Sequence, residues 1–204
     1  MIEVEDKSEI ERTFASLNVV IIGLPGSGKT TLINSLSPRP NYISVGDITR
    51  NEVLNNGPLA GQIKQRFMDD KPWDADFVIS LIAPYLLGLK KVREGFVLDG
   101  IPRRVGEVLP LLDWFRKNSI SIDLLLNLQV APDLALERRK AQDRKDRLEL
   151  PEHYDSRIRS YLSGENEMLE ILRNGSLHYL SIDTNLLSEQ LFKDKLIEFV
   201  ATNF

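Results

Sequence analysis

The chain has 204 residues, a formal net charge of −4, two histidines and no cysteine. The length fits one compact domain, and the composition excludes disulfides, thiol chemistry and a zinc site built from cysteine or from histidine alone. The acidic balance argues against nucleic-acid binding, and no segment resembles a membrane span or a secretory leader, so we expect a cytoplasmic protein that binds neither nucleic acid nor membrane.

Short apolar segments alternate with longer amphipathic ones, which is typical of an α/β fold around a parallel sheet. Residues 1–16 form a polar extension that can be a helix on the outside of the core, and residues 17–204 are expected to form one domain. Strands are expected at 19–22, 42–45, 96–98, 124–130 and 179–182, and helices at 29–36, 47–54, 59–68, 75–90, 104–118, 132–141, 152–173 and 188–201.

The first apolar segment leads into Gly23-Leu24-Pro25-Gly26-Ser27-Gly28-Lys29-Thr30, which satisfies the pattern GxxxxGK[ST]. Between a strand and a helix, this pattern predicts a phosphate-binding loop whose backbone N–H groups surround phosphate oxygens. Lys29 reaches the β- and γ-phosphates, and the Thr30 hydroxyl can bind Mg²⁺. The alternative is a turn that binds nothing, but such a turn would need neither the lysine nor the threonine hydroxyl. The expected ATP-binding residues here are Gly23, Pro25, Gly26, Ser27, Gly28, Lys29, Thr30 and Thr31.

A second motif is FVLDGIPRR, residues 96–104. Its apolar strand ends in Asp99, at the edge of the sheet where the phosphate loop also opens. An aspartate there can hold Mg²⁺ through water, so Thr30 and Asp99 are the expected metal residues. A simpler interpretation is an aspartate that caps the following turn.

Further segments follow one another along the chain: VVIIGLPGSGKTT, ISVGDITR, GPLAGQIKQRFMDD, GFVLDGIPRR, DLLLNLQVAPDLALERR, DRKDR and RIRSY. In this order they resemble segments of the adenylate kinases and their nucleoside monophosphate kinase relatives. The resemblance covers most of the chain and implies a three-layer P-loop kinase fold: a five-stranded parallel sheet with helices on both faces, a helical acceptor-binding arm at about 47–73 and a short lid at about 142–150.

The resemblance also implies roles for individual residues. One group binds the monophosphate acceptor, and another contacts ATP and the transferring phosphoryl group. Arginine suits this work because its planar guanidinium binds phosphate through two N–H groups and keeps its charge. Taken singly, each arginine could instead be a solvated surface charge. The acceptor group is Val45, Asp47, Arg50, Gly100, Arg103 and Glu107; Arg138 belongs to the ATP group; the catalytic residues are Lys29, Arg103, Arg144 and Arg157.

The chain departs from the family pattern in its lid and its arm. Gln142 stands where the family commonly has a second arginine, and Arg147 replaces an aspartate of the lid motif. Arg139 or Arg147 is a candidate to supply the missing charge. The segment is too short for the long, zinc-bearing form of the lid, so we expect a short lid without metal. In the arm, Lys71-Pro72-Trp73-Asp74 replaces the family's usual loop.

A further departure concerns the acceptor base. Glu107 occupies the position of a family glutamine that reads adenine, and Val45 replaces a threonine nearby. An ionised carboxylate only accepts hydrogen bonds, which suits the N1–H and 2-amino donors of guanine better than adenine N1. In the competing interpretation, Glu107 pairs with Arg104 or faces solvent and does not read the base.

The sequence therefore predicts reversible transfer of the ATP γ-phosphoryl group, with Mg²⁺, to a nucleoside monophosphate. AMP is the default acceptor, with GMP or dGMP as a possibility, and a monomer is expected. Two alternatives stay open: a P-loop kinase of another small metabolite, and a weakly catalytic nucleotide-binding regulatory protein, which the altered lid favours.

Overall fold

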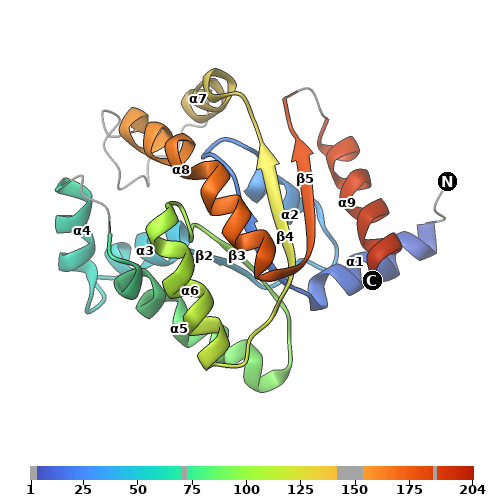
Figure 1. The fold of residues 1–204 in the computed structure, drawn as a ribbon, viewed down its shortest axis with the longest axis horizontal. Helices are drawn as coiled ribbons and strands as arrows, with labels where there is room; N and C mark the ends of the chain where they lie inside the picture. Colours follow the sequence, from blue (N-terminus) through green and yellow to red (C-terminus); the bar gives the residue numbers. More distant parts are fainter. Residues whose placement is uncertain (1–3, 70–72, 142–153, 186–187) are drawn as a thin grey trace.

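The computed structural model of the chain describes residues 4–69, 73–141, 154–185 and 188–204. Its centre is a five-stranded parallel sheet in the order β2-β3-β1-β4-β5 (Figure 1). Every strand is rich in aliphatic or aromatic residues, as expected for strands that helices cover on both faces. The strands are β1 (Asn18–Ile22), β2 (Tyr42–Ser44), β3 (Phe96–Asp99), β4 (Ile122–Gln129) and β5 (Ser176–Asp183).

The helices form two layers against the sheet and an arm beside it (Figure 1). In the described residues, one layer packs on the core cluster that contains Val19 and Ile21, and the other on the cluster that contains Val20 and Ile22. The first layer consists of α1 (Val4–Ser16), α2 (Lys29–Ser35) and α9 (Glu189–Asn203). The second layer includes α5 (Ala75–Val92), α6 (Val105–Lys117) and α8 (Tyr154–Asn174). The arm consists of α3 (Val45–Leu54) and α4 (Ala60–Met68), and α7 (Pro132–Ala141) follows β4.

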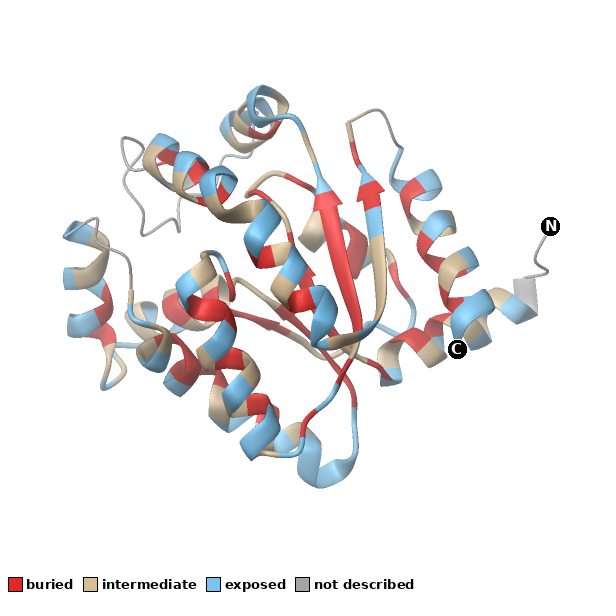
Figure 2. Cartoon of the chain, in the orientation of Figure 1, coloured by how far each residue is buried: buried red, intermediate tan, exposed pale blue. Residues whose placement is uncertain are grey.

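Strand β1 shows why the fold has three layers. Its residues Val19 to Ile22 are at most 2% exposed, and they alternate between the two core clusters. Successive side chains of a strand point to opposite faces, so a strand apolar at every position needs cover on both sides. Figure 2 shows β4 as mostly buried and β5, at the edge of the sheet, as largely intermediate, beside helices whose outer faces are exposed. The predicted three-layer α/β fold is confirmed.

Two local expectations need revision. Val45 was expected to end a strand, but it is the first residue of α3, because the Ser44 hydroxyl caps that helix by accepting a hydrogen bond from Asp47 N. Residues 4–16 do form a helix on the outside of the core, as expected, and α1 also contributes a buried side chain to that core. Its Phe14 is 1% exposed and packs with residues of α2 and α9.

The strand register brings the functional segments together. Asp99, the last residue of β3, pairs with Ile21 of β1 on one side and with Ser44 of β2 on the other. In parallel strands the carboxyl ends share one edge of the sheet. The loop after β1, the start of α3 and the loop after β3 therefore meet at that edge.

Candidate functional site

The loop between β1 and α2 follows a path that only glycine tolerates at two points. Gly23 and Gly26 have φ angles of 139° and 95°, where other residues are strained. A Cβ atom would lie 2.4 Å from the Leu128 carbonyl oxygen at the first position and 2.4 Å from the Ala135 carbonyl oxygen at the second. The loop thus fits closely between β4 and α7. Its backbone can turn N–H groups inward, as a phosphate site requires.

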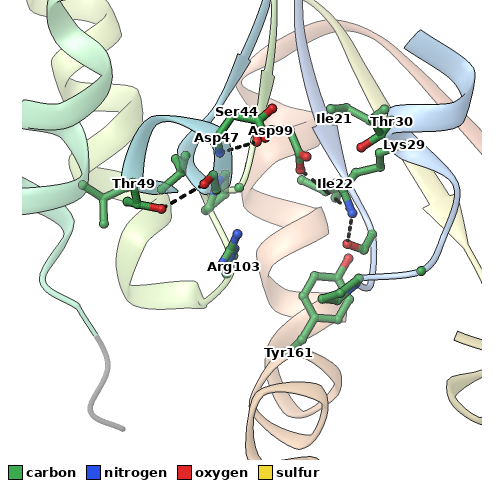
Figure 3. A pocket seen from close by; sticks show the side chains of 18 of the residues that line it. Ile21, Ile22, Lys29, Thr30, Ser44, Asp47, Thr49, Asp99, Arg103 and Tyr161 are labelled. Atoms are coloured by element: carbon green, nitrogen blue, oxygen red, sulfur yellow. Dashed lines mark hydrogen bonds and ion pairs between the residues drawn. The ribbon is translucent and has the colours of Figure 1, made fainter. Parts of the chain in front are cut away.

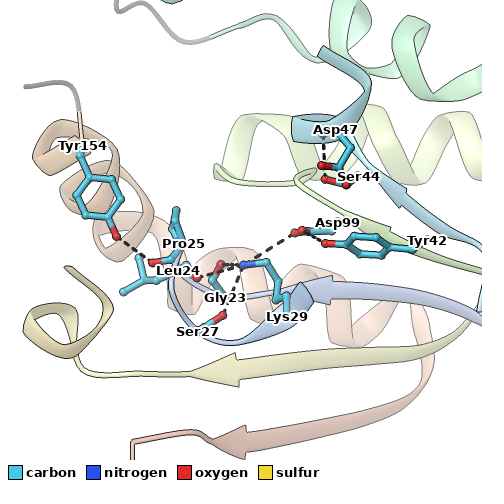
Figure 4. Close-up of polar contacts among 10 residues, drawn as sticks. All are labelled: Gly23, Leu24, Pro25, Ser27, Lys29, Tyr42, Ser44, Asp47, Asp99 and Tyr154. Atoms are coloured by element: carbon cyan, nitrogen blue, oxygen red, sulfur yellow. Dashed lines mark hydrogen bonds and ion pairs between the residues drawn. The ribbon is translucent and has the colours of Figure 1, made fainter. Parts of the chain in front are cut away.

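Lys29, the first residue of α2, directs its ammonium group back into this loop (Figure 4). Nζ donates to the carbonyl oxygens of Gly23 at 2.7 Å and Leu24 at 3.1 Å, and it lies 3.9 Å from Asp99 Oδ1. Burial lowers the pKa of Lys29, the Asp99 carboxylate opposes that shift, and Arg103 lowers it further. The ammonium is therefore desolvated beside the loop, where it interacts strongly with an anion.

Asp99 is held from its other side by Tyr42. The Tyr42 hydroxyl donates to Asp99 Oδ2 at 2.5 Å. Burial and the neighbouring carboxylate raise the pKa of Tyr42, so the hydroxyl keeps its proton and remains a donor. The two oxygens of Asp99 thus have different neighbours, Lys29 and Tyr42.

Thr30 and Asp99 offer a candidate site for a magnesium ion. Both line the same cavity and offer oxygen atoms, the donor type that Mg²⁺ prefers. Among the residues that the structure describes, no group of three or more His, Cys, Asp or Glu is placed to hold a metal by itself. A site with one or two protein oxygens, completed by phosphates and water, is the usual mode for Mg²⁺ with nucleotides.

The phosphate loop opens into a cavity of about 530 Å³ that reaches to α3 and to the loop after β3 (Figure 3). In the described parts of the chain, five cationic side chains and three acidic ones line it, although the whole protein carries net charge −4. A local excess of positive charge in an acidic protein favours an anionic ligand. The lining cations are Lys29, Arg50, Arg103, Arg104 and Arg139, and the acids are Asp47, Asp99 and Glu107.

The far wall of the cavity belongs to the arm. Arg50 forms an ion pair with Asp47 one turn earlier on α3, and both line the cavity together with Val45. Aromatic rings add an apolar wall: Phe67 and Trp73 pack edge to face with their centroids 5.0 Å apart, and both line the cavity. This side can therefore accept a group with both a charged end and a flat apolar part.

Glu107 lines the cavity and is 6% exposed. Its Oε2 accepts a hydrogen bond from Arg103 N at 2.6 Å, and its Oε1 lies 3.6 Å from Arg104 Nη1. Burial raises the pKa of Glu107, while the hydrogen bond and the two arginines act in the opposite direction. The pairing with Arg104 that the competing interpretation expected is present, and the side chain also faces the cavity.

The predicted site residues are brought together only in part. Ser27 is fully buried in the loop and does not line the cavity. Arg138 also lies outside the lining and donates to the Thr184 carbonyl oxygen at 2.7 Å, beyond the end of β5. Arg144 and the lid at 142–150 lie outside the described residues, as does the side chain of Arg157. The other residues predicted to bind ATP or the acceptor line the cavity: Gly23, Pro25, Gly26, Gly28, Lys29, Thr30, Thr31, Val45, Asp47, Arg50, Asp99, Gly100, Arg103 and Glu107.

The sequence reasoning missed several residues of the site. Tyr42 contacts Asp99, and Tyr154 at the start of α8 donates to the Pro25 carbonyl oxygen at 2.9 Å. Arg139, named above as a substitute for the missing lid charge, lies over the Tyr154 ring at 4.2 Å and lines the cavity. Only spacing could have suggested Tyr42: it is two residues before Ser44, hence on the same face of β2. Ser156, Ser160 and Tyr161 of α8 also line the cavity.

The fold and the site together define a P-loop nucleotide-binding protein, since a phosphate loop, a lysine and an acid at a neighbouring strand end lie around one cationic cavity. Residues 21–196 match the family model described as adenylate kinase. The chain belongs to the adenylate kinase family.

Individual relatives agree with this assignment. An adenylate kinase of Limosilactobacillus reuteri is 32% identical over 125 residues, which are 60% of this chain and 57% of that protein. Those of Leuconostoc mesenteroides and Xanthomonas euvesicatoria are 32% identical over 143 and 151 residues, covering 69% and 71% of this chain and 75% and 79% of theirs. The chain thus aligns with little more than half the length of some relatives. In the part of the chain that is described, no helix is long and apolar enough to cross a membrane.

Proposed function

We propose that this protein transfers the γ-phosphoryl group of ATP reversibly to a nucleoside monophosphate. The observation that carries the proposal is one cavity that is lined by the phosphate loop with Lys29, by Arg103 and, on the arm, by Arg50. Two anionic substrates can lie end to end in such a space. Membership of the adenylate kinase family supports the same reaction.

Phosphoryl transfer asks a protein mainly to align two anions and to stabilise charge on the moving group. Lys29 acts on the phosphates from the loop, and Arg103 faces the same region from the loop after β3. Thr30 and Asp99 would hold Mg²⁺, which when bound neutralises phosphate charge. Arg50, fixed by Asp47, would bind the acceptor phosphate.

Further arginines complete the proposed site. Arg144 and Arg157 would contact the transferring group, and Arg138 would lie at the ATP side, where its hydrogen bond to Thr184 fixes the loop after β5. Arg139, which lines the cavity beside Tyr154, would supply charge that Gln142 cannot. These proposed roles rest on the family resemblance and on charge, and the activity of a variant of each arginine tests them.

For the acceptor base, AMP is the default and GMP or dGMP is the proposed competitor. Glu107 lines the cavity with a carboxylate where an amide would serve adenine better. The aromatic wall of Phe67 and Trp73 supports a flat base but does not select between purines.

The test is a coupled assay of diphosphate formation from ATP and each of AMP, GMP, dGMP, CMP and UMP. We expect transfer with a purine monophosphate, and Lys29→Ala should lower turnover about a hundredfold or more, because it removes a charge that stabilises the transition state. Lys117→Ala, an exposed lysine at the end of α6, is the matched control and should keep its activity. Near-normal turnover in a folded Lys29→Ala protein would contradict the kinase assignment.

A further inference from the structure

The carboxylate of Asp99 is held between two polar groups from different elements (Figure 4). Tyr42, at the start of β2, donates its hydroxyl to Oδ2 at 2.5 Å, whereas Oδ1 lies 3.9 Å from Lys29 Nζ. A carboxylate on a single bond can rotate freely. With one oxygen bound to Tyr42, the plane of this carboxylate is fixed, and Oδ1 is directed toward the phosphate loop.

Thr30 of α2 lines the same cavity as Asp99. The carboxylate that Tyr42 holds therefore faces the cavity that also contains the other residue expected to bind Mg²⁺.

We propose that Tyr42 is a positioning residue for the magnesium–nucleotide site, orienting the Asp99 carboxylate. The inference rests on the proposed function, since it concerns the metal that accompanies ATP. Tyr42 does not line the cavity among the described residues, so it acts through Asp99 and not by touching substrate. Removal of a group that orients a metal ligand in this way commonly lowers metal affinity about 10- to 100-fold.

The hydroxyl can be removed with little disturbance of packing. The Tyr42 ring is partly buried and packs against the core cluster beneath β1 and β4, which includes Val19 and Leu126. Tyr42→Phe keeps this ring contact and removes only the donor. The matched control is Tyr85→Phe, because Tyr85 lies on α5 and is 53% exposed. Urea unfolding of both variants checks that they are folded.

The readout is the affinity for a non-hydrolysable ATP analogue, measured by calorimetry with magnesium and again with a chelator. In the wild-type protein, magnesium should tighten binding. In Tyr42→Phe we expect this tightening to fall by about tenfold, with the metal-free affinity unchanged. In an Asp99→Asn background, Tyr42→Phe should have little additional effect, because the carboxylate that it orients is gone.

Three results would overturn the inference: equal tightening in Tyr42→Phe and the wild-type protein, an equal loss in Tyr85→Phe, or no magnesium effect in the wild-type protein at all. The proposed function fails separately. If Tyr42→Phe loses the magnesium effect but the wild-type protein transfers phosphate to no nucleoside monophosphate, the reaction is wrong and the role of Tyr42 stands.

Discussion

Three of the cations that line the cavity lie beside acids of the same site. Among the described residues, Arg50 pairs with Asp47, Lys29 lies near Asp99, and Arg104 pairs with Glu107. Two of these pairs join residues three apart in the sequence, and the third joins the start of α2 to the end of β3. Such pairs fix the direction of a side chain before an anion arrives, which lowers the entropy lost on binding. The acids therefore contribute to recognition of phosphate, although they carry negative charge as phosphate does.

Glu107 gives the sharpest prediction at the scale of one residue. As an ionised carboxylate it accepts hydrogen bonds only, so Glu107→Gln should raise the preference for AMP over GMP by about five- to a hundredfold, the cost of one mismatched buried contact. The measurement is the ratio of kcat/KM for the two acceptors. Glu94→Gln is a suitable control, since Glu94 is exposed and lies outside the cavity lining.

The same residue predicts a pH dependence. Because burial raises the pKa of Glu107, its neutral form persists to higher pH than that of an exposed glutamate. The neutral carboxyl has an O–H donor and matches adenine, so the AMP preference of the wild-type protein should rise as the pH falls. The Gln variant should not show this trend. A ratio that is unchanged by the substitution at every pH would mean that Glu107 does not read the base.

At the scale of elements, the sequence predicted what periodicity and motifs encode, namely the strands, most helix positions and the phosphate loop. It missed contacts that depend on how distant elements meet. The Ser44 cap moved the start of α3 to Val45, and the hydrogen bond of Tyr42 to Asp99 joins residues 57 apart. The polar character of residues 1–16 concealed Phe14, which is 1% exposed and packs α1 on the core together with the partly buried Ile10.

Helix α1 also supports the far end of the phosphate-binding helix. Glu11 accepts a hydrogen bond from Ser37 N at 2.5 Å and pairs with Lys193 of α9 at 2.7 Å, and Lys193 donates to the Ser35 carbonyl oxygen that ends α2. The Glu11 side chain is only 7% exposed. The network therefore joins three helices around the end of α2.

Glu11→Ala should lower the free energy of unfolding by roughly 1–3 kcal/mol, because it leaves the Ser37 N–H and the Lys193 ammonium without this acceptor. Urea denaturation measures the change. Glu9→Ala, which removes an exposed carboxylate two residues earlier on the same helix, should shift the midpoint far less. Equal effects of the two substitutions would show that α1 is attached only by its apolar side.

At the scale of the whole molecule, positive charge gathers around the cavity, although the net charge of the protein is −4. The cations of the cavity come from α2, α3, α7 and the loop after β3, elements that meet only when the sheet is formed. Figure 3 shows Arg103 and Asp47 on one side of the cavity and Lys29 and Thr30 on the other. The proposed reaction requires that the two substrates be enclosed, because water in the site would allow ATP hydrolysis in place of transfer.

Enclosure predicts a more compact molecule when both sides are occupied. A bisubstrate analogue with two nucleosides joined by a phosphate chain should lower the radius of gyration measured by X-ray scattering, and Lys29→Ala, which weakens the phosphate contacts, should require more analogue for the same change. Arg144→Ala tests the expected lid in the coupled assay of diphosphate formation: we expect lower turnover with little change in the KM for the monophosphate, because we propose that this arginine contacts the transferring group. A radius of gyration that stays constant at saturating analogue would mean that the arm and lid do not close.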